Sequence, residues 1–256
     1  MIETGGEVPT LPPPFRVVAY DRIGSTSDEA KRLAAAGATH GTLVWAREQT
    51  SGRGRLDRSW VSPRGNLFMS AVLRPDLPPV RAAELGFVAA LAVADMVESF
   101  VPATGRVRLK WPNDVLADGA KLSGILLEAW SGPTGQVDWV VLGIGVNIAA
   151  APTDTPYPAT ALHALGGAQP DTRAVLERLG ITLAERLVLW ESQGFAPIRR
   201  DWLARARGLG EALEIRQGGA PVIGRFLDLD LDGALVLETA SGLRRITAGD
   251  VHFQGL

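Results

Sequence analysis

The 256-residue sequence contains no cysteine and only three histidines. Without cysteine the chain has no disulfide, no thiolate nucleophile and no cysteine-ligated metal, and one reason to expect an oxidising compartment is removed. His40, His163 and His252 stand far apart and in no recognisable metal-ligand spacing. The sequence therefore excludes thiol redox chemistry, and we expect no resident metal site and histidines in ordinary surface or core positions.

Long apolar runs are also missing: no stretch approaches the roughly 20 residues that cross a bilayer. The N-terminus, MIETGGEVPTLPPPF, carries early acidic residues and four prolines, whereas a signal peptide has a basic segment followed by an apolar one. We therefore expect a cytoplasmic protein with no membrane association, in which residues 1–14 are loosely held.

Neither sign of charge dominates, since 26 basic residues face 28 acidic ones and the formal net charge is -2. The arginines of QTSGRGRLDRSWVS, residues 49–62, are therefore a local group in a balanced chain. Gly52 and Gly54 let the backbone approach a ligand, and Arg53, Arg55 and Arg58 offer forked donors suited to phosphate or carboxylate. Arginine-rich loops are also often solvated surface, so composition alone leaves both interpretations open.

Apolar periodicity predicts an α+β protein. We expect strands at 16–20, 42–48, 67–75, 107–116, 121–130 and 137–148, and helices at 28–37, 79–100, 171–192 and 196–206. After residue 208 the pattern changes to short strands with tight turns, at 212–219, 221–233, 234–242 and 243–253. We therefore predict a main domain over residues 15–207 and a small β module over residues 208–256.

The segment KWPNDVLADGAKLSGILLE is the second candidate site. Pro112 removes a ladder donor, so residues 111–114 are expected at a strand end or bend, where Asn113 and Asp114 could orient a ligand or bind a metal-phosphate. Lys121 taken alone is more simply solvated surface. Trp60 and Trp111 flank the two candidate segments, which leaves ligand stacking open.

Glycines also interrupt an apolar strand at GIGVN, residues 143–147, where they mark close approach of a ligand or a bulge. This is not a dinucleotide fingerprint, because the third glycine is missing and no helix follows. The sequence also contains no Walker phosphate loop and no serine-elbow motif.

Taken in order, GSTS, QTSGRGR, KWPNDVL, KLSGILLE and GIGVNI resemble the motifs of the biotin protein ligases. The resemblance runs from about residue 20 to the C-terminus, because RFLDLDLDGALVLETASGLRRITAGDV is similar to the C-terminal barrel of these enzymes. It implies an α+β fold: a mixed β-sheet catalytic domain of the biotin/lipoate ligase type, followed by a small C-terminal β-barrel.

The resemblance also implies an activity. A ligase of this family uses ATP with Mg²⁺ to convert biotin to biotinyl-adenylate, and then transfers it to a lysine of a biotin carboxyl carrier protein. The resemblance implies no nucleic-acid partner and allows a homodimer. Some members carry a helix-turn-helix before the catalytic domain, and since none precedes residue 15 here, we expect a ligase without repressor function. A lipoate- or octanoate-type ligase, and a nucleic-acid-binding module that uses the arginine loop, remain the alternatives.

Roles follow from the resemblance position by position. The implied catalytic residues are Lys121, Arg53, Arg55 and Asp114. The implied biotin-binding residues are Ser25, Thr26, Ser27, Gln49, Gly52, Arg53, Lys121, Gly124, Gly143 and Gly145. The implied nucleotide-binding residues are Arg53, Gly54, Arg55, Trp60, Asn113, Asp114, Lys121 and Asn147. Two positions depart from the family pattern: Ser27 stands where asparagine is common, and Asp57 where glycine is common.

Overall fold

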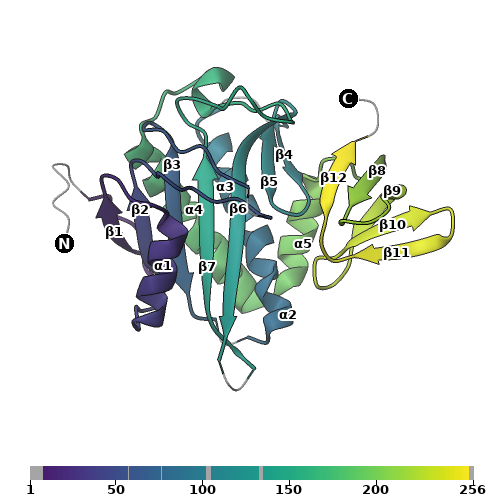
Figure 1. Ribbon diagram of the computed structural model, residues 1–256, viewed down its shortest axis with the longest axis horizontal. Coiled ribbons are helices and arrows are strands. Elements are labelled where there is room, and N and C mark those ends of the chain that lie inside the picture. The colour runs from purple at the N-terminus through teal and green to yellow at the C-terminus, as the bar shows by residue number, and fades with distance from the viewer. Residues whose placement is uncertain (1–7, 57, 76, 102–104, 133–134, 254–256) are drawn as a thin grey trace.

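The computed structural model describes residues 8–56, 58–75, 77–101, 105–132 and 135–253. It places a seven-stranded mixed sheet between helices, with a five-stranded antiparallel sheet beside it (Figure 1). The α+β class predicted from the sequence is confirmed.

The large sheet has the strand order β1-β2-β3-β7-β6-β5-β4. Only the β1–β2 pair is parallel, and the other neighbouring strands are antiparallel. Its strands are β1 (Arg16–Tyr20), β2 (Thr42–Ala46), β3 (Leu67–Leu73), β4 (Val107–Lys110), β5 (Asp114–Ala117), β6 (Ala120–Ser131) and β7 (Val137–Val146). All seven residues of β3 are buried, because the strand lies in the interior of a sheet covered on both faces.

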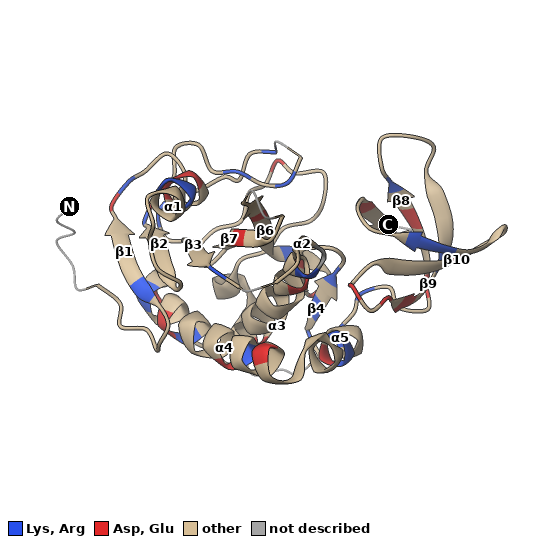
Figure 2. Cartoon of the chain, turned by 90° about the horizontal axis from the view of Figure 1, so that it is seen from below, with Lys and Arg blue, Asp and Glu red and all other residues tan. Residues whose placement is uncertain are grey.

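Helices lie on both faces of this sheet, as Figure 2 shows. The short α1 (Thr26–Ala35) packs on β2, β3 and β7 from one face, and its first turn is capped by the Ser25 side chain, which accepts from the backbone N–H of Asp28. The other helices, α2 (Pro79–Ala82), α3 (Glu84–Glu98), α4 (Thr172–Gln193) and α5 (Phe195–Ala204), cover the opposite face. Since α3 is enclosed by the sheet, α4 and α5, nearly all its residues are buried, which explains its apolar composition.

The C-terminal module is a sheet of five antiparallel strands in the order β11-β10-β9-β8-β12. They are β8 (Ala212–Arg216), β9 (Val222–Leu229), β10 (Leu235–Thr239), β11 (Gly242–Ile246) and β12 (Asp250–Phe253). Within the described residues β11 and β12 are its two edges and do not pair, so the strands form an open sheet where the resemblance implied a closed barrel.

The C-terminal module packs against the edge of the large sheet that carries β4. The indole N–H of Trp111 donates to the carbonyl of Gly233 at 3.0 Å, and this contact is buried. Gly233 has a φ of 85°, and a Cβ built there would lie 2.5 Å from the Phe87 ring of α3. The chain entering the module also bonds to β4, since Leu109 accepts from Arg207 at 2.8 Å.

Three predicted boundaries need correction. The helix predicted at 79–100 is two helices, α2 and α3. The strand predicted at 107–116 is two antiparallel strands, β4 and β5, and the strand predicted at 243–253 is two successive strands, β11 and β12. The first of these strands is interrupted by the turn Trp111–Pro112–Asn113, so the bend predicted there is confirmed. Residues 1–14 were expected to be loosely held; residues 1–7 lie outside the described residues, but Pro9 is buried and Leu11 packs against Gly180 of α4.

Candidate functional site

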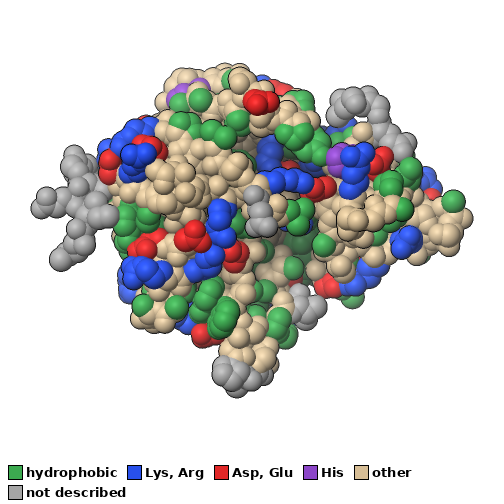
Figure 3. Space-filling model, viewed as in Figure 1, with side chains coloured by type: hydrophobic (Ala, Val, Ile, Leu, Met, Phe, Trp, Pro, Cys, Tyr) green, Lys and Arg blue, Asp and Glu red, His purple; other side chains and the backbone are tan. Residues whose placement is uncertain are grey.

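A cavity opens on the face of the large sheet that carries α1. Its walls are the arginine loop, the turn between β4 and β5, the loop that follows β7, and the start of β12. The lining residues are Thr26, Ser27, Gln49, Arg53, Gly54, Arg55, Arg58, Ser59, Trp60, Val61, Phe68, Met69, Ser70, Lys110, Trp111, Pro112, Asn113, Asp114, Lys121, Gly124, Ile125, Leu126, Gly143, Ile144, Gly145, Asn147, Pro152, Thr155, Pro156, Tyr157, Ala159, Asp250 and Val251. Figure 3 shows charged side chains gathered near the centre of this face, beside the C-terminal module.

Glycines form the floor of the cavity. Gly124 of β6 pairs with Gly145 of β7 in the sheet, and the indole of Trp60 lies directly over both. A Cβ built at Gly145 would lie 2.6 Å from the Trp60 indole nitrogen, and one at Gly124 would lie 2.9 Å from its Cζ3. Only glycine therefore admits the tryptophan, and Trp60 presents a flat aromatic wall whose buried N–H has no partner among the described residues.

A buried polar network forms the end of the cavity beside α1. Gln49 Oε1 accepts from the backbone N–H of Thr26 at 2.8 Å, and its amide nitrogen donates to Ser62 Oγ at 3.0 Å. The hydroxyls of Thr26 and Ser27 lie 2.9 Å and 3.1 Å from Ser70 Oγ. These contacts fix the orientation of several neutral donors and acceptors, as recognition of a neutral polar head group requires.

The opposite end of the cavity is cationic. Lys121 Nζ lies 2.6 Å from Asp114 Oδ1 and 5.5 Å from the centre of the Trp60 ring. Arg55 donates to Asn113 Oδ1 at 3.1 Å, and burial lowers the pKa of its guanidinium. Because a buried cation without a carboxylate partner is costly, this arrangement favours an anionic ligand.

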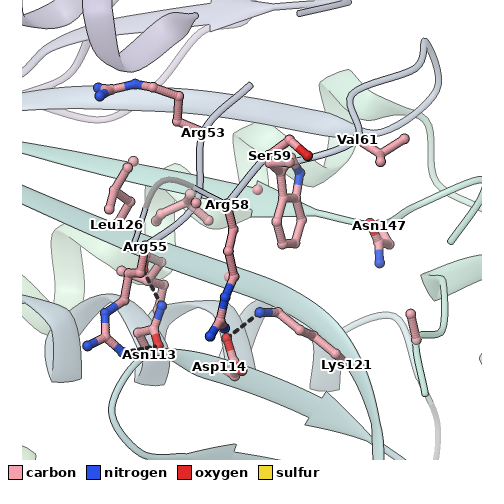
Figure 4. Close-up of a pocket in the computed structure, with 18 of the residues that line it drawn as sticks. Arg53, Arg55, Arg58, Ser59, Val61, Asn113, Asp114, Lys121, Leu126 and Asn147 are labelled. Atoms are coloured by element: carbon pink, nitrogen blue, oxygen red, sulfur yellow. Dashed lines mark hydrogen bonds and ion pairs between the residues drawn. The ribbon is translucent and has the colours of Figure 1, made fainter. Parts of the chain in front are cut away.

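The three arginines of the arginine loop extend in two directions (Figure 4). Arg55 and Arg58 extend toward Asn113 and Asp114, and Arg58 also pairs with Asp250 at the start of β12. Arg53 points away from them (Figure 4), and its guanidinium is bound by two carboxylates, 2.8 Å from Glu128 and 2.9 Å from Asp28. We call this group, with Lys31, which pairs with both acids, the Arg53 cluster.

The loop after β7 closes the cavity from another side. Lys121 donates its backbone N–H to Pro158 and accepts from Thr160, so this segment is fixed to the start of β6. Asn147 contributes by donating its side-chain amide to the Thr160 carbonyl at 3.1 Å. The lining residue Asn147 therefore holds the loop through its amide.

A second lysine lies where the cavity meets the C-terminal module. The Nζ of Lys110 lies 4.5 Å from the ring centre of Tyr157 and 5.7 Å from that of Phe253. Burial lowers the pKa of this ammonium, and the neighbouring Lys121 lowers it further, whereas Asp114 and Asp250 act in the opposite direction.

The structure brings most predicted site residues into one cavity. Two do not line it: the Ser25 side chain caps α1, and Gly52 lies behind the wall, where a Cβ would meet Ser62 Oγ and the Trp60 carbonyl at 2.5 Å. Arg53 lines the cavity but is turned to the Arg53 cluster. Asp57 lies outside the described residues. Several polar and charged lining residues were not among the predicted site residues, and they include Arg58, Ser70, Lys110, Tyr157 and Asp250.

Some of those residues carried a signal in the sequence. Ser70 is the polar residue in the otherwise apolar strand LFMSAVL, and Lys110 opens the motif KWPND. Tyr157 lies in a segment without a motif, and Asp250 lies in the segment that is similar to the C-terminal barrel, to which no site residue was assigned. In the described part of the chain, no group of three or more His, Cys, Asp or Glu residues is placed to hold a metal ion, and no helix is long and apolar enough to span a membrane.

Comparisons with known proteins agree with this geometry. Residues 19–147 match the model of the biotin/lipoate A/B protein ligase family, and residues 208–253 match that of the biotin protein ligase C terminal domain. A biotin--[acetyl-CoA-carboxylase] ligase of Paracoccus denitrificans is 42% identical over 91% of this chain and 99% of its own.

Two solved structures are also similar. The biotin protein ligase of Aquifex aeolicus in complex with biotin and ATP is 28% identical, with a TM-score of 0.79 over 92% of this chain and 97% of that one. The biotin protein ligase of Leishmania major in complex with biotinyl-5-AMP is 25% identical, with a TM-score of 0.68 over 92% and 100% of the two chains.

Proposed function

The chain belongs to the biotin protein ligases of the biotin/lipoate A/B protein ligase family, and from this premise we propose how its residues divide the reaction. The enzyme activates biotin with ATP as biotinyl-adenylate and transfers the biotinyl group to a lysine of a biotin carboxyl carrier protein. The observation that carries the residue assignment is the polarity of the cavity: a neutral hydrogen-bonding end and a cationic end, separated by Trp60 on a glycine floor.

This polarity supports one orientation of the substrates. The ureido ring of biotin is neutral and rich in donors and acceptors, so we place it at the network of Thr26, Ser27 and Gln49. The carboxylate and the α-phosphate are anionic, so we place them at Lys121 and Arg55. Trp60 lies between these ends, and we assign its ring to stacking of the nucleotide base and its unpartnered N–H to a hydrogen bond with the ligand.

In the first step the biotin carboxylate attacks the α-phosphorus of ATP, and the bond to the bridging oxygen breaks to release pyrophosphate. Negative charge accumulates on the phosphoryl oxygens. Lys121 is fixed by Asp114 and by the Trp60 face, so its charge is already in place when the charge develops, and this preorganisation lowers the barrier. Arg55, fixed by Asn113, contributes in the same way.

We propose that Mg²⁺ enters with the nucleotide. Mg²⁺ in nucleotide sites is commonly held by one or two carboxylates together with substrate phosphates. The cavity offers Asp114 and Asp250 and, in the described residues, no larger cluster, which fits a metal that the triphosphate carries. When bound there, the ion would offset phosphate charge.

In the second step the carrier lysine attacks the acyl carbon of the adenylate and AMP leaves. A lysine ammonium must first lose a proton, and we assign that acceptor, or the group that orients the amine, to Asp114. Its side chain faces the cavity and is 16% exposed, so it can be reached from outside while its ion pair with Lys121 maintains its position.

The arginine loop covers the cavity between these steps. An acyl phosphate is hydrolysed by water, so a loop that closes over it protects the intermediate.

We infer that the reaction takes place in the cytoplasm, where ATP is supplied. The alternatives are not favoured: Arg53 and Arg58 are paired with the protein's own carboxylates, which does not suit a nucleic-acid surface, and the polar network suits a ureido ring better than an octanoyl or lipoyl chain.

Formation of an enzyme-bound acyl-adenylate from biotin and ATP, measured beside lipoate and octanoate, tests this function. We expect biotin alone to give an adenylate; adenylate from lipoate and none from biotin would contradict the substrate assignment. Asp114→Asn tests the second step, because it should retain adenylate formation better than transfer to a carrier domain. Normal transfer by this variant would contradict the role of Asp114.

A further inference from the structure

We propose that Lys110 binds the β- and γ-phosphates of ATP and then the departing pyrophosphate, at the end of the cavity that faces the C-terminal module. This inference rests on the proposed orientation of the nucleotide. The step it serves is the breaking of the bond between the α-phosphorus and the bridging oxygen, whose electron pair leaves with pyrophosphate. Lys110 stabilises that charge without transferring a proton.

The register of the large sheet places Lys110 on the path of the phosphates. One cross-strand row runs through Gly145, Gly124, Asp114 and Lys110, on four neighbouring strands. Trp60 covers the two glycines, and Asp114 comes next with its partner Lys121. Adjacent strands are about 4.8 Å apart, so Lys110 lies about 5 Å beyond Asp114 along this row. A triphosphate whose α-phosphate lies at Lys121 reaches Lys110 by extending along the row.

Among the described residues, Lys110 has no carboxylate in direct contact, although Asp114 and Asp250 act on its charge from a distance. In the described part of the chain it forms no ion pair, and its ammonium is placed between the rings of Tyr157 and Phe253. Aromatic faces attract a cation but compensate poorly for lost hydration, and burial accordingly lowers its pKa. A polyanionic ligand would supply the missing partner.

The choice of lysine supports the same role. Only three of the 26 basic residues are lysine, at positions 31, 110 and 121, and two of these three face the cavity. All other basic residues are arginine. The two cavity positions therefore carry a compact ammonium in a chain that otherwise uses the planar guanidinium for its positive charges. A compact point charge suits a site that must release its phosphate product.

The C-terminal module takes part in this site. Phe253 of β12 forms one side of the Lys110 environment, and Asp250 at the start of the same strand pairs with Arg58. Both contacts lie at the phosphate end, away from the polar network beside α1. The module is therefore expected to act in the ATP-dependent step and not in transfer of a preformed adenylate.

The test is to measure adenylate formation and transfer to the carrier separately in the variant Lys110→Met. We expect at least a tenfold rise in the KM for ATP in adenylate formation, and a similar rise in the KM for pyrophosphate when the reaction is run in reverse from biotinyl-adenylate. Transfer from supplied biotinyl-adenylate to a carrier domain should stay within about twofold of the wild type. Lys110→Arg, which retains the charge, should lose less than Lys110→Met.

Arg108→Met is the matched control, because Arg108 lies two residues earlier on the same strand, faces the same side, is exposed and does not line the cavity. It should leave both half-reactions unchanged. An unchanged KM for pyrophosphate in Lys110→Met, or an equal loss in the transfer step, would overturn the inference while leaving the proposed function intact. A wild-type enzyme that forms no biotinyl-adenylate would overturn both.

Discussion

The closest fit in the cavity is that of the Trp60 indole on Gly124 and Gly145. A methyl group at Gly145 would lie 2.6 Å from the ring, and overpacking of this kind costs about 1–3 kcal/mol. Gly145→Ala should therefore displace Trp60 and lower the affinity for ATP roughly tenfold or more, with a change in tryptophan fluorescence. Isothermal titration calorimetry measures the affinity for ATP. The control is Gly132→Ala, because no atom lies within 4 Å of the added Cβ there. Equal affinity in the two variants would show that Trp60 does not form the nucleotide wall.

For individual residues, the motifs predicted which side chains lie together in the cavity, but not which of them form ion pairs with one another. Lys121, Asp114 and Asn113 lie together as the resemblance implied. The direction of Arg53 could not be predicted, because it depends on Asp28 of α1, which follows the GSTS motif, and on Glu128 of β6, which ends the KLSGILLE motif. The arginine side chain reaches several partners, and only the packing of those elements decides among them.

At the scale of elements, the Arg53 cluster links the arginine loop to α1 and β6. If Arg53 acts on the adenylate, its ion pairs with Glu128 and Asp28 must first break. Ion pairs this exposed contribute about 0.2–1 kcal/mol, so Glu128→Gln should lower the KM for ATP, by at most about fivefold. Steady-state kinetics of adenylate formation measure this change. A higher KM would mean that the pair with Glu128 belongs to the working conformation of the loop.

Strand and helix positions were largely predictable, because apolar periodicity reflects which face of an element is buried. The turn at residues 111–113 was predictable from Pro112, but the pairing of β4 with β5 was not, since the two form a short hairpin inside the segment that was predicted as one strand. That the C-terminal sheet is open could also not be predicted from the sequence, because closure into a barrel depends on whether the edge strands β11 and β12 pair.

At the scale of the whole molecule, Trp111 joins the C-terminal module to the catalytic sheet. Trp111→Phe would leave the buried Gly233 carbonyl without its donor, which costs about 1–3 kcal/mol. The free energy of unfolding should fall by about that amount in urea denaturation. Trp130→Phe is the control, because Trp130 is 59% exposed, and it should have little effect. Equal stability of the two variants would contradict this role.

The half-buried ammonium of Lys110 makes stability depend on pH. Burial lowers its pKa from an ordinary value of 10.5, with Lys121 and Arg58 acting in the same direction and Asp114 and Asp250 in the other. Between the lowered pKa and the ordinary one the unfolded chain binds more protons than the folded one, so stability rises with pH. The free energy of unfolding of the wild type, relative to Lys110→Met, should therefore increase as pH rises through this alkaline window. Urea titrations of both proteins at pH 7 and pH 10 measure it, and a decrease would contradict the burial of the charge.

Long-range contacts of this kind explain why the phosphate end of the site was incompletely predicted. Arg58 and Asp250 are separated by 192 positions, and their pairing depends on how the two sheets dock. Motifs locate residues that lie close in the chain or in one sheet, whereas Tyr157 and Asp250 reach the cavity only through tertiary packing.

We propose that Lys121 holds the anionic end of the substrates in a preorganised site. Transfer of labelled biotin to a purified carrier domain, with ATP and Mg²⁺, tests it in Lys121→Ala beside Arg108→Ala. Loss of a preorganised charge at the reacting phosphate typically costs on the order of 10²-fold or more in rate. We expect such a loss for Lys121→Ala and a normal rate for Arg108→Ala, whereas a near-normal rate in Lys121→Ala would show that Lys121 does not hold the reacting phosphate.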